Sequence, residues 1–429
     1  MFQTLKNAWA MPELRKKMLY TLFIILIFRF GSCIPVPFID TTLLSQYFEQ
    51  ASVNGSMLGY LDMFTGGGLS RATIFAMSIT PYINASIILQ LLTVAIPALE
   101  RMVKDGGEEG REKIASWTRY LGVLLGLLQG LSYYALLRNG FGGKTMLSNT
   151  GALAAVTIIV TFTAGTALIM WMGEHITQKG IGNGISLIIF AGIVARFPQG
   201  VMTIYQYIQA GSINIFQALL FVVIALFMII VVIEVTQGQR RVAVQYAKRI
   251  VGRKMYGGHS THIPLKVNQA GVIPIIFASS VLMFPITIAQ FVQNDTVQWI
   301  ASYFAWGTVT NTVMYAVLIM FFTYFYTAIS LNIPQLTENM QKYGGFIPGI
   351  RPGQPTALYI DRIMTRITLA GAFFLAFIAI LPNFIGWITG IEGVYFGGTA
   401  ILIVVGVAID TMKQAESLVL NRQYQGFMK

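Results

Sequence analysis

Long apolar runs separated by shorter polar segments dominate this chain. Ten of the runs reach the roughly 20 residues that a helix needs to cross about 30 Å of hydrocarbon. They lie near residues 18–36, 72–96, 117–137, 152–172, 184–203, 214–235, 271–291, 309–330, 363–382 and 395–412. We therefore expect ten membrane-spanning helices, an even number that places both termini on the same side of the membrane.

The second run and the residues just before it have an unusual polar content. A short apolar piece, Met57–Phe64, leads through the glycine triplet Gly66–Gly68 into residues 72–96. Inside that run lie Thr73, Ser78, Thr80, Pro81, Asn84, Ser86 and Gln90. Unsatisfied hydrogen-bonding groups are costly in hydrocarbon, which disfavours a lipid-facing helix. The residues allow either a cavity-lining helix after a hinged piece or an amphipathic helix packed on other spans after a plain loop.

Composition indicates a membrane protein with one helical bundle. The 429 residues are 55% hydrophobic and only 11% charged, whereas about a quarter of the residues in soluble domains are charged. The single cysteine, Cys33, excludes an intrachain disulfide and a cysteine-based metal cluster. The basic N-terminal segment enters the first apolar run with no small-residue cleavage site after it, so we expect an uncleaved first span.

The positive charges are distributed asymmetrically between the segments that join the spans. With the N-terminus inside, 23 of the 29 Lys and Arg residues fall on inner segments, and only Arg71, Arg138, Lys144 and Arg196 fall on outer ones. This asymmetry predicts that both termini are cytoplasmic. The net charge of +12 also indicates contact with anionic lipid or with a partner that contains nucleic acid.

Two inner loops are long enough to suggest a function of their own. Thr236–Asn268 has seven basic residues and no acidic one, and its alternating pattern around Arg241–Tyr246 predicts a projecting hairpin. In Leu331–Asp361 we expect a helix that begins at Pro334 and ends at Gly344, followed by an extended tip that carries Arg351. The excess of positive charge favours a partner site over a mere orientation signal.

The chain lacks the residue patterns of an enzyme. Its only histidines are His175, His259 and His262. His259 and His262 are three residues apart, but no cysteine and no nearby carboxylate completes a metal shell there. It has no phosphate-binding glycine loop and no nucleophile motif, and few charges lie inside the spans. We therefore expect no catalysis, no metal and no cofactor, and favour a passive channel driven by a partner. The alternatives are an ion-coupled small-solute transporter, which needs titratable residues along its path, and an intramembrane protease, which needs an activated nucleophile.

Seven motifs, in order along essentially the whole chain, resemble the SecY family of bacterial protein-translocation channels. They are Phe64–Arg71 (FTGGGLSR), Ile79–Ile83 (ITPYI), Gly180–Ser186 (GIGNGIS), Gly238–Arg241 (GQRR), Asn268–Pro274 (NQAGVIP), Ile350–Gly353 (IRPG) and Tyr395–Thr399 (YFGGT). The resemblance implies an all-α polytopic fold of ten transmembrane helices in two pseudo-symmetric, inverted halves of five around a central pore. The halves would be residues 1–203 and 214–412, the latter with cytoplasmic loops 236–270 and 331–361, followed by a short cytoplasmic tail, 413–429.

The resemblance also implies four groups of site residues. The pore ring corresponds to Ile79, Ile83, Ile185, Ile189, Ile276 and Ile403. The plug, about 57–67, and its hinge correspond to Met57, Leu58, Leu61, Phe64, Gly66, Gly67 and Gly68. The lateral gate corresponds to Gln90 and Asn268. The docking sites for SecA or the ribosome correspond to Arg240, Arg241, Lys248, Arg249, Arg253 and Arg351.

Spacing is compatible with the pore ring that the resemblance implies. The pairs Ile79/Ile83 and Ile185/Ile189 are four residues apart, which puts both members of a pair on one helix face. A collar of branched aliphatic side chains can close a pore by dewetting. At the last position the register is open, because Ile401 lies two residues before Ile403.

The function implied by the resemblance is passive conduction of unfolded preproteins across the bacterial cytoplasmic membrane, with sideways release of hydrophobic segments into lipid. The implied partners are SecE and SecG beside the bundle, the SecA ATPase and the ribosome at the cytoplasmic loops, and the signal sequence of the preprotein. No small-molecule substrate is expected.

Overall fold

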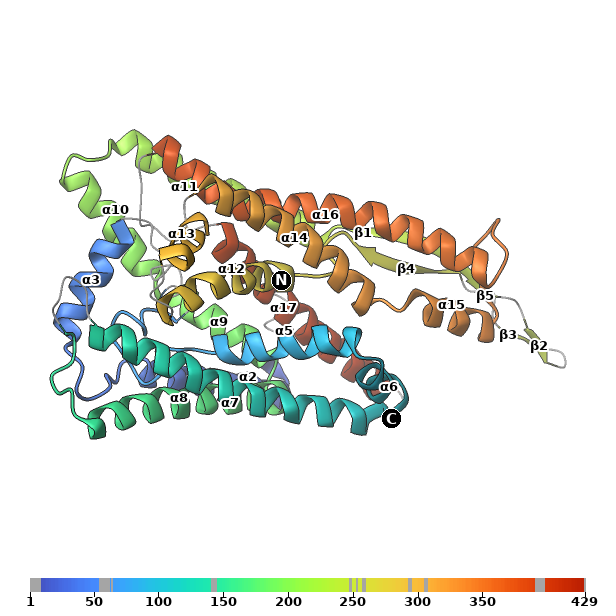
Figure 1. The fold of residues 1–429 in the computed structure, drawn as a ribbon. Helices are drawn as coiled ribbons and strands as arrows, with labels where there is room; N and C mark the ends of the chain where they lie inside the picture. The colour runs from blue at the N-terminus through green and yellow to red at the C-terminus, as the bar shows by residue number, and fades with distance from the viewer. Residues whose placement is uncertain are drawn as a thin grey trace.

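The chain folds into a bundle of long helices that lie along a common direction, with a small sheet projecting from one end (Figure 1). The computed structural model describes residues 9–53, 62, 65–139, 145–246, 249–251, 254–256, 260–291, 295–304, 308–389 and 398–427.

The helices begin and end as follows. The first part of the chain forms α2 (Pro12–Gly31), α3 (Thr41–Val53), α5 (Thr80–Ala95), α6 (Pro97–Asp105), α7 (Gly107–Asn139), α8 (Ala152–Lys179), α9 (Gly184–Ala195) and α10 (Phe197–Gln209). The second part forms α11 (Ile215–Gln237), α12 (Ile273–Phe291), α13 (Asp295–Tyr303), α14 (Val309–Ser330), α15 (Ile333–Lys342), α16 (Gln354–Thr389) and α17 (Gly398–Phe427). The strands are β1 (Gln239–Tyr246), β2 (Arg249–Val251), β3 (Lys254–Tyr256), β4 (Ser260–Lys266) and β5 (Gly345–Phe346).

The short connecting elements gather at the two ends of the bundle. In Figure 1, α3, α10 and α13 lie at one end, whereas α6, α15 and the strands lie at the other. The two long predicted inner loops therefore share one end with the α6 segment. This arrangement agrees with the alternation of inner and outer segments that the charge pattern predicts.

Each predicted span overlaps at least one helix, although the helices differ in how well they suit a membrane. Seven helical segments among the described residues are long and apolar enough to cross one, or eight if α5 and α6, bent by 105° at Ile96, count together. α12 contains a shorter apolar stretch, Ile273–Leu282. The first predicted span coincides with α2, which begins and ends earlier than expected and has charged residues in its first turns. The count of ten remains a prediction.

The expected helix over 72–96 is wrong in its first part. α5 begins only at Thr80, and the preceding residues form a chain of turns. Ala72 and Ser78 have φ of 43° and 49°, left-handed values that a helix does not contain. Local turn bonds, such as Ser78 N–H to Phe75 O at 2.9 Å, satisfy part of the segment's backbone, and Ile74 N–H donates to Ile34 O in another part of the chain at 3.0 Å. The segment therefore packs as irregular chain inside the protein, where its polar backbone finds partners.

Polar side chains fix several helix ends. The Asn183 side chain accepts hydrogen bonds from the N–H groups of Ile185 and Ser186 at the start of α9. Ahead of α3, the Asp40 carboxylate accepts from the Thr42 hydroxyl and from the N–H groups of Thr42 and Leu43. These bonds to the charged form, that of the Thr42 hydroxyl above all, lower the pKa of Asp40.

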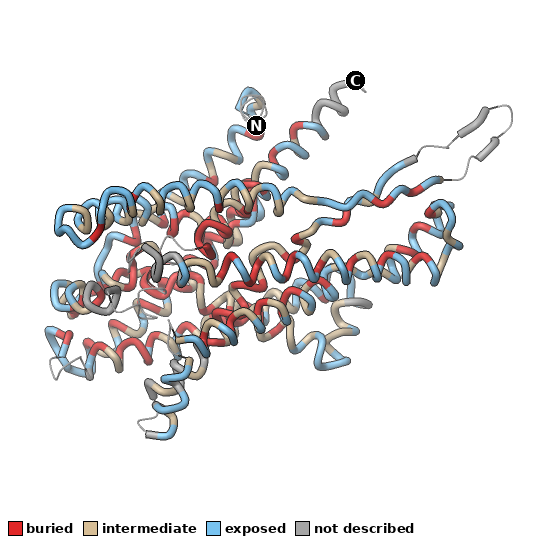
Figure 2. Tube along the Cα trace, turned by 90° about the horizontal axis from the view of Figure 1, so that it is seen from above, coloured by how far each residue is buried: buried red, intermediate tan, exposed pale blue. Residues whose placement is uncertain are grey.

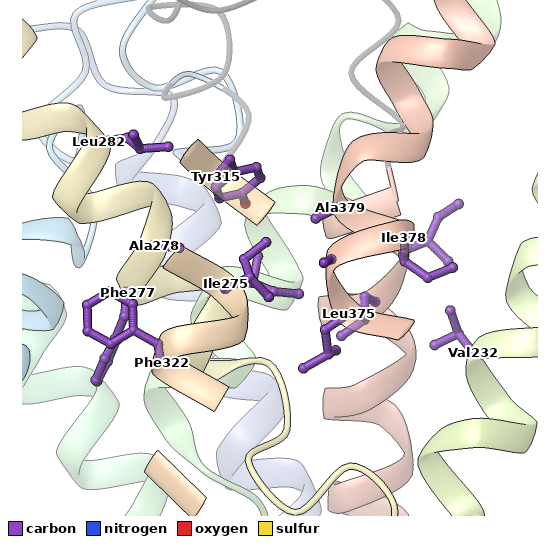
Figure 3. Close-up of a cluster of buried hydrophobic side chains, with 14 of the residues drawn as sticks. Val232, Ile275, Phe277, Ala278, Leu282, Tyr315, Phe322, Leu375, Ile378 and Ala379 are labelled. Carbon is purple, nitrogen blue, oxygen red and sulfur yellow. The ribbon is translucent and has the colours of Figure 1, made fainter. Parts of the chain in front are cut away.

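Among the described residues, three large hydrophobic clusters fill the bundle, and two of them include residues of α17. One of these two, shown in Figure 3, joins α11, α12, α14 and α16 through Val232, Ile275, Phe277, Tyr315 and Leu375. The other joins α2, α8, α9 and α17 and includes the N-cap residue of α5. Buried residues follow the lines where helices meet, and long outer faces remain exposed (Figure 2). Exposed apolar faces of this extent suit contact with hydrocarbon.

The predicted hairpin in the first long inner loop is confirmed. β1 and β4 pair antiparallel from Gln239 opposite Lys266 to Gln245 opposite Ser260. The second long loop adds β5, which pairs with the end of β1 to give the strand order β4-β1-β5. The predicted helix in that loop is also confirmed as α15. The two loops therefore form one structural unit, which we call the platform (the described residues of 239–266 and 331–361).

Candidate functional site

Five of the six predicted pore-ring isoleucines gather in one hydrophobic cluster. Ile79 is the N-cap residue of α5, and Ile83 lies one turn further along that helix. Ile185 and Ile189 belong to α9, and Ile403 belongs to α17. Ile79, Ile189 and Ile403 are buried in one hydrophobic cluster, and the other two are half-buried against it. We call these five residues the isoleucine cluster. It brings together elements from both predicted halves of the chain.

The sixth predicted member, Ile276, does not join this group. It is half-buried on α12 and belongs to none of the three large hydrophobic clusters, whereas its neighbour Ile275 is buried in the second cluster, that of Figure 3. On α17, Ile401 is also buried in the second cluster. The structure therefore places Ile403, not Ile401, with Ile79 and Ile189.

The described part of the predicted plug and hinge is a tight turn held between helices. Gly66 and Gly67 have φ of 67° and 85°, which glycine adopts without the strain that a Cβ would bring. A methyl group on Gly66 would lie 2.7 Å from Arg29 Nη1 and 3.1 Å from Gly192 Cα, so the turn sits directly on α9. At Gly68 it would lie 2.9 Å from Thr73 Oγ1. Met57, Leu58, Leu61 and Phe64 lie outside the described residues.

The two predicted lateral-gate residues do not hydrogen-bond to each other in the part of the chain that the structure describes. Gln90 is half-buried on α5, and its Nε2 lies 3.5 Å from Ser86 Oγ, one turn earlier. Asn268 is 6% exposed, and its Oδ1 has no hydrogen-bond partner among the described residues. α5 and α12 meet instead through apolar side chains, with Ile87 in the same cluster as Ile275 and Ala278. The expected polar pair is replaced by an apolar contact and a buried, unsatisfied amide oxygen.

The predicted docking residues that the structure describes lie on the platform. Arg240 and Arg241 are exposed on β1, and Arg351 is exposed beyond β5, on a turn in which Gly349 has a φ of 80°. Arg249 is in β2, opposite Tyr256. Lys248 and Arg253 lie outside the described residues.

The platform has a hydrophobic core of its own. Val242 and Val244 alternate with exposed residues along β1 and pack on Met340 of α15 and Ile360 of α16. Side chains that alternate along a strand point to opposite faces. The exposed Arg241 therefore lies on the face opposite this core, and the platform presents its arginines on a rigid support.

The comparison with known proteins identifies the family. Residues 73–412 match the SecY family model. The protein translocase subunit SecY of Streptomyces coelicolor is 44% identical over 447 residues, which cover all of both chains. The chain belongs to the SecY family. Its SecY relatives include the protein translocase subunits of Aquifex aeolicus, 42% identical over 431 residues with full coverage of both chains, and Thermotoga maritima, 42% identical over 435 residues with 100% and 98% coverage.

Solved structures share the SecY fold found here. "The structure of a protein conducting channel" matches with a TM-score of 0.64 at 18% identity, covering 94% of this chain and 91% of that one. Sec61 in the canine ribosome-channel complex from the endoplasmic reticulum matches with a TM-score of 0.59 at 17% identity and the same coverage. These likenesses establish the architecture, and the full-length relatives establish the family.

Sequence reasoning missed one buried ion pair beside the glycine turn. Asp62 Oδ2 lies 2.9 Å from Arg196 Nη1, and the two residues are far apart in the chain. The sequence did contain a signal for this pair, because Asp62 is a carboxylate inside the apolar piece Met57–Phe64. A charge in an apolar setting is costly unless it finds a partner. Among the described residues, no group of three or more His, Cys, Asp or Glu side chains is arranged to hold a metal ion.

Proposed function

We propose that this chain is the channel subunit of a protein translocase in a bacterial cytoplasmic membrane. It conducts unfolded preproteins across the membrane and releases hydrophobic segments sideways into lipid. One observation carries the proposal: in a chain 44% identical over its full length to a protein translocase subunit, isoleucines from both halves of the bundle meet in one hydrophobic cluster.

The isoleucine cluster acts as the pore ring of the resting channel. Branched aliphatic side chains exclude water and ions when they pack together. They can also part around a passing chain without holding it by hydrogen bonds, because they have none to offer. Ile276 takes part only if α12 moves toward the ring, since its side chain lies outside the cluster.

The glycine turn is the base of the plug, which covers about residues 57–67. The left-handed backbone of Gly66 and Gly67 gives this turn a conformation that residues with a Cβ rarely adopt. The contact between α5 and α12 is the lateral gate. Because that contact is apolar, a hydrophobic signal sequence can replace it with little loss of packing energy.

The platform is the docking site for the SecA ATPase and for the ribosome. Its exposed arginines suit acidic protein side chains and ribosomal RNA phosphates. SecE and SecG are the expected neighbours of the bundle in the membrane. Both chain termini lie in the cytoplasm, on the side of the platform.

The role is non-catalytic, and energy comes from the docked partner. Few charges lie inside the spans of the sequence, as expected for a channel without ion coupling. The alternative of an ion-coupled small-solute transporter gains no support from the relatives, which are named as protein translocase subunits.

A reconstituted export assay tests this function. The purified chain is placed in proteoliposomes with SecE, and SecA, ATP and a preprotein with a signal sequence are added outside. We expect part of the preprotein to become protected from added protease, and to lose this protection when SecA or ATP is omitted. A folded, inserted chain that gives no ATP-dependent protection would refute the proposal.

A further inference from the structure

The glycine turn is folded around the side chain of Asp62. This carboxylate is 2% exposed, and its Oδ1 accepts the Ser70 N–H at 2.8 Å and the Thr65 hydroxyl at 3.3 Å. The backbone carbonyl of Asp62 accepts the Gly67 N–H at 3.0 Å. Loss of the carboxylate charge would weaken the hydrogen bonds that hold residues 65–70 in place.

Neighbouring helices hold the same turn. Arg196 lies between α9 and α10, and its Nη1 forms the 2.9 Å ion pair with Asp62 Oδ2, at an angle outside that of a hydrogen bond. From α7, the Tyr133 hydroxyl donates to Leu69 O at 2.8 Å. Gly66 rests against Gly192 of α9. Asp62 therefore connects the turn to a helix of the isoleucine cluster.

Burial makes this ion pair different from an ordinary surface pair. The Asp62 side chain is 2% exposed and the Arg196 side chain 20%, whereas Lys113 and Glu109 form a pair whose side chains are 58% and 77% exposed. Solvent screens the surface pair, but a buried charge that loses its partner stays poorly solvated. As long as the turn stays in place, breaking this pair therefore costs more free energy than breaking the surface pair.

A second arginine, Arg29, also lies against the turn. Arg29 Nη1 approaches Gly66 and has no hydrogen-bond partner among the described residues. Arg71 is close enough to Arg29 to act on it electrostatically. A turn that leaves this position would separate the Asp62 carboxylate from Arg196, whose guanidinium would then stay largely buried without its partner.

We propose that the Asp62–Arg196 ion pair is a latch that holds the plug in the resting channel and sets how readily a signal sequence opens it. The latch rests on the proposed function, because it assigns the turn to a plug. Asp62 and Arg196 are positioning residues. They act through the turn and need not contact the translocated chain.

Two measurements on the resting protein test the latch. The variants Asp62→Asn and Arg196→Gln each remove one charge, and Glu174→Gln, which breaks the 2.7 Å pair with Arg119 between α8 and α7, is the matched control. We expect the first two to raise ion conductance across planar bilayers by at least about tenfold. We also expect hydrogen–deuterium exchange to quicken at the amides of Gly67, Leu69 and Ser70, with Glu174→Gln like the unchanged chain.

Rescue separates the latch from a general loss of folding. Asp62→Glu and Arg196→Lys keep the charges and should recover most of the tight closure. The double variant Asp62→Asn/Arg196→Gln should leak no more than the worse single variant, because the two residues act as one pair. Additive effects, failed rescue in folded protein, or unchanged conductance and exchange in the single variants would overturn the latch.

The outcome is distinct from a failure of the proposed function. Conductance and exchange are measured without SecA, ATP or preprotein, so they report on the latch alone. If the unchanged chain does not export preproteins, the proposed function fails whatever these two measurements give. If it exports them while Asp62→Asn behaves as the unchanged chain, only the latch fails.

Discussion

Shortening Ile403 should open the resting channel, whereas the same change at Ile401 should not. Both side chains are buried on α17, with 1% and 3% of their surface exposed. Ile403 packs in the isoleucine cluster, and Ile401 packs in the second hydrophobic cluster. The variants Ile403→Ala and Ile401→Ala therefore remove identical groups from the same helix at two positions with different roles.

The expected magnitude follows from what each side chain meets when the pore opens. A water-filled pore would expose Ile403 to water, and its burial in the closed state is worth about 0.8 kcal/mol for each carbon. The three carbons lost in alanine remove about 2.4 kcal/mol from the closed state, which raises the open fraction by about 50-fold. Ile401 stays buried in both states, so its truncation lowers overall stability without changing the balance between them.

Single-channel recording in planar bilayers measures this difference directly. We expect frequent openings for Ile403→Ala without any partner, and resting behaviour for Ile401→Ala after correction for the amount of folded protein. Equal conductance of the two variants, or a larger leak for Ile401→Ala, would refute the assignment of Ile403 to the pore ring.

Three further predictions concern other parts of the molecule. Gly66→Ala should lower thermal stability by more than Gly67→Ala. In both variants the new Cβ at a left-handed φ costs about 1 kcal/mol or more, but only at position 66 would it meet Arg29 and Gly192 at close range. Equal melting temperatures of the two variants would contradict the tight packing of the turn. Arg351→Glu should abolish SecA-driven export, while Lys342→Glu, on the neighbouring α15, should leave most of it; equal protease protection in both would remove the role of Arg351. Asp40 has a lowered pKa, so its capping bonds are complete above the ordinary value and are lost as the pH falls through the lowered one. Hydrogen exchange at the start of α3 should follow this titration, and Asp40→Asn should remove the pH dependence; a profile shared by both forms would speak against the cap.

The sequence could predict the helices but not the chain of turns before α5. Apolar runs identify a span because hydrocarbon demands them, whatever the backbone conformation. Residues 72–79 continue such a run, yet Ala72 and Ser78 have left-handed φ values and Ile74 pairs with Ile34. A pattern of hydrophobicity gives no sign of this, because the partner that satisfies the backbone lies in another part of the chain.

Contacts between distant residues account for the remaining differences. The alternation along β1 predicted the hairpin, but β5 has only two residues and no pattern that would pair it with Tyr246. The family resemblance assigned Gln90 and Asn268 to the lateral gate. In the structure the amide of Gln90 turns to Ser86 on its own helix. The Asp62–Arg196 pair likewise depends on how the turn packs against α9.

The three-stranded platform has a mechanical consequence. β1 follows α11 directly, and residues 267–272 alone separate β4 from α12. That connection is itself tied down, since Val267 N–H donates to Gly238 O at 2.9 Å. A force applied to the paired strands would therefore meet little slack before it reached the bundle. The sheet would transmit such a force to α12, the helix that carries Ile275 and Ile276.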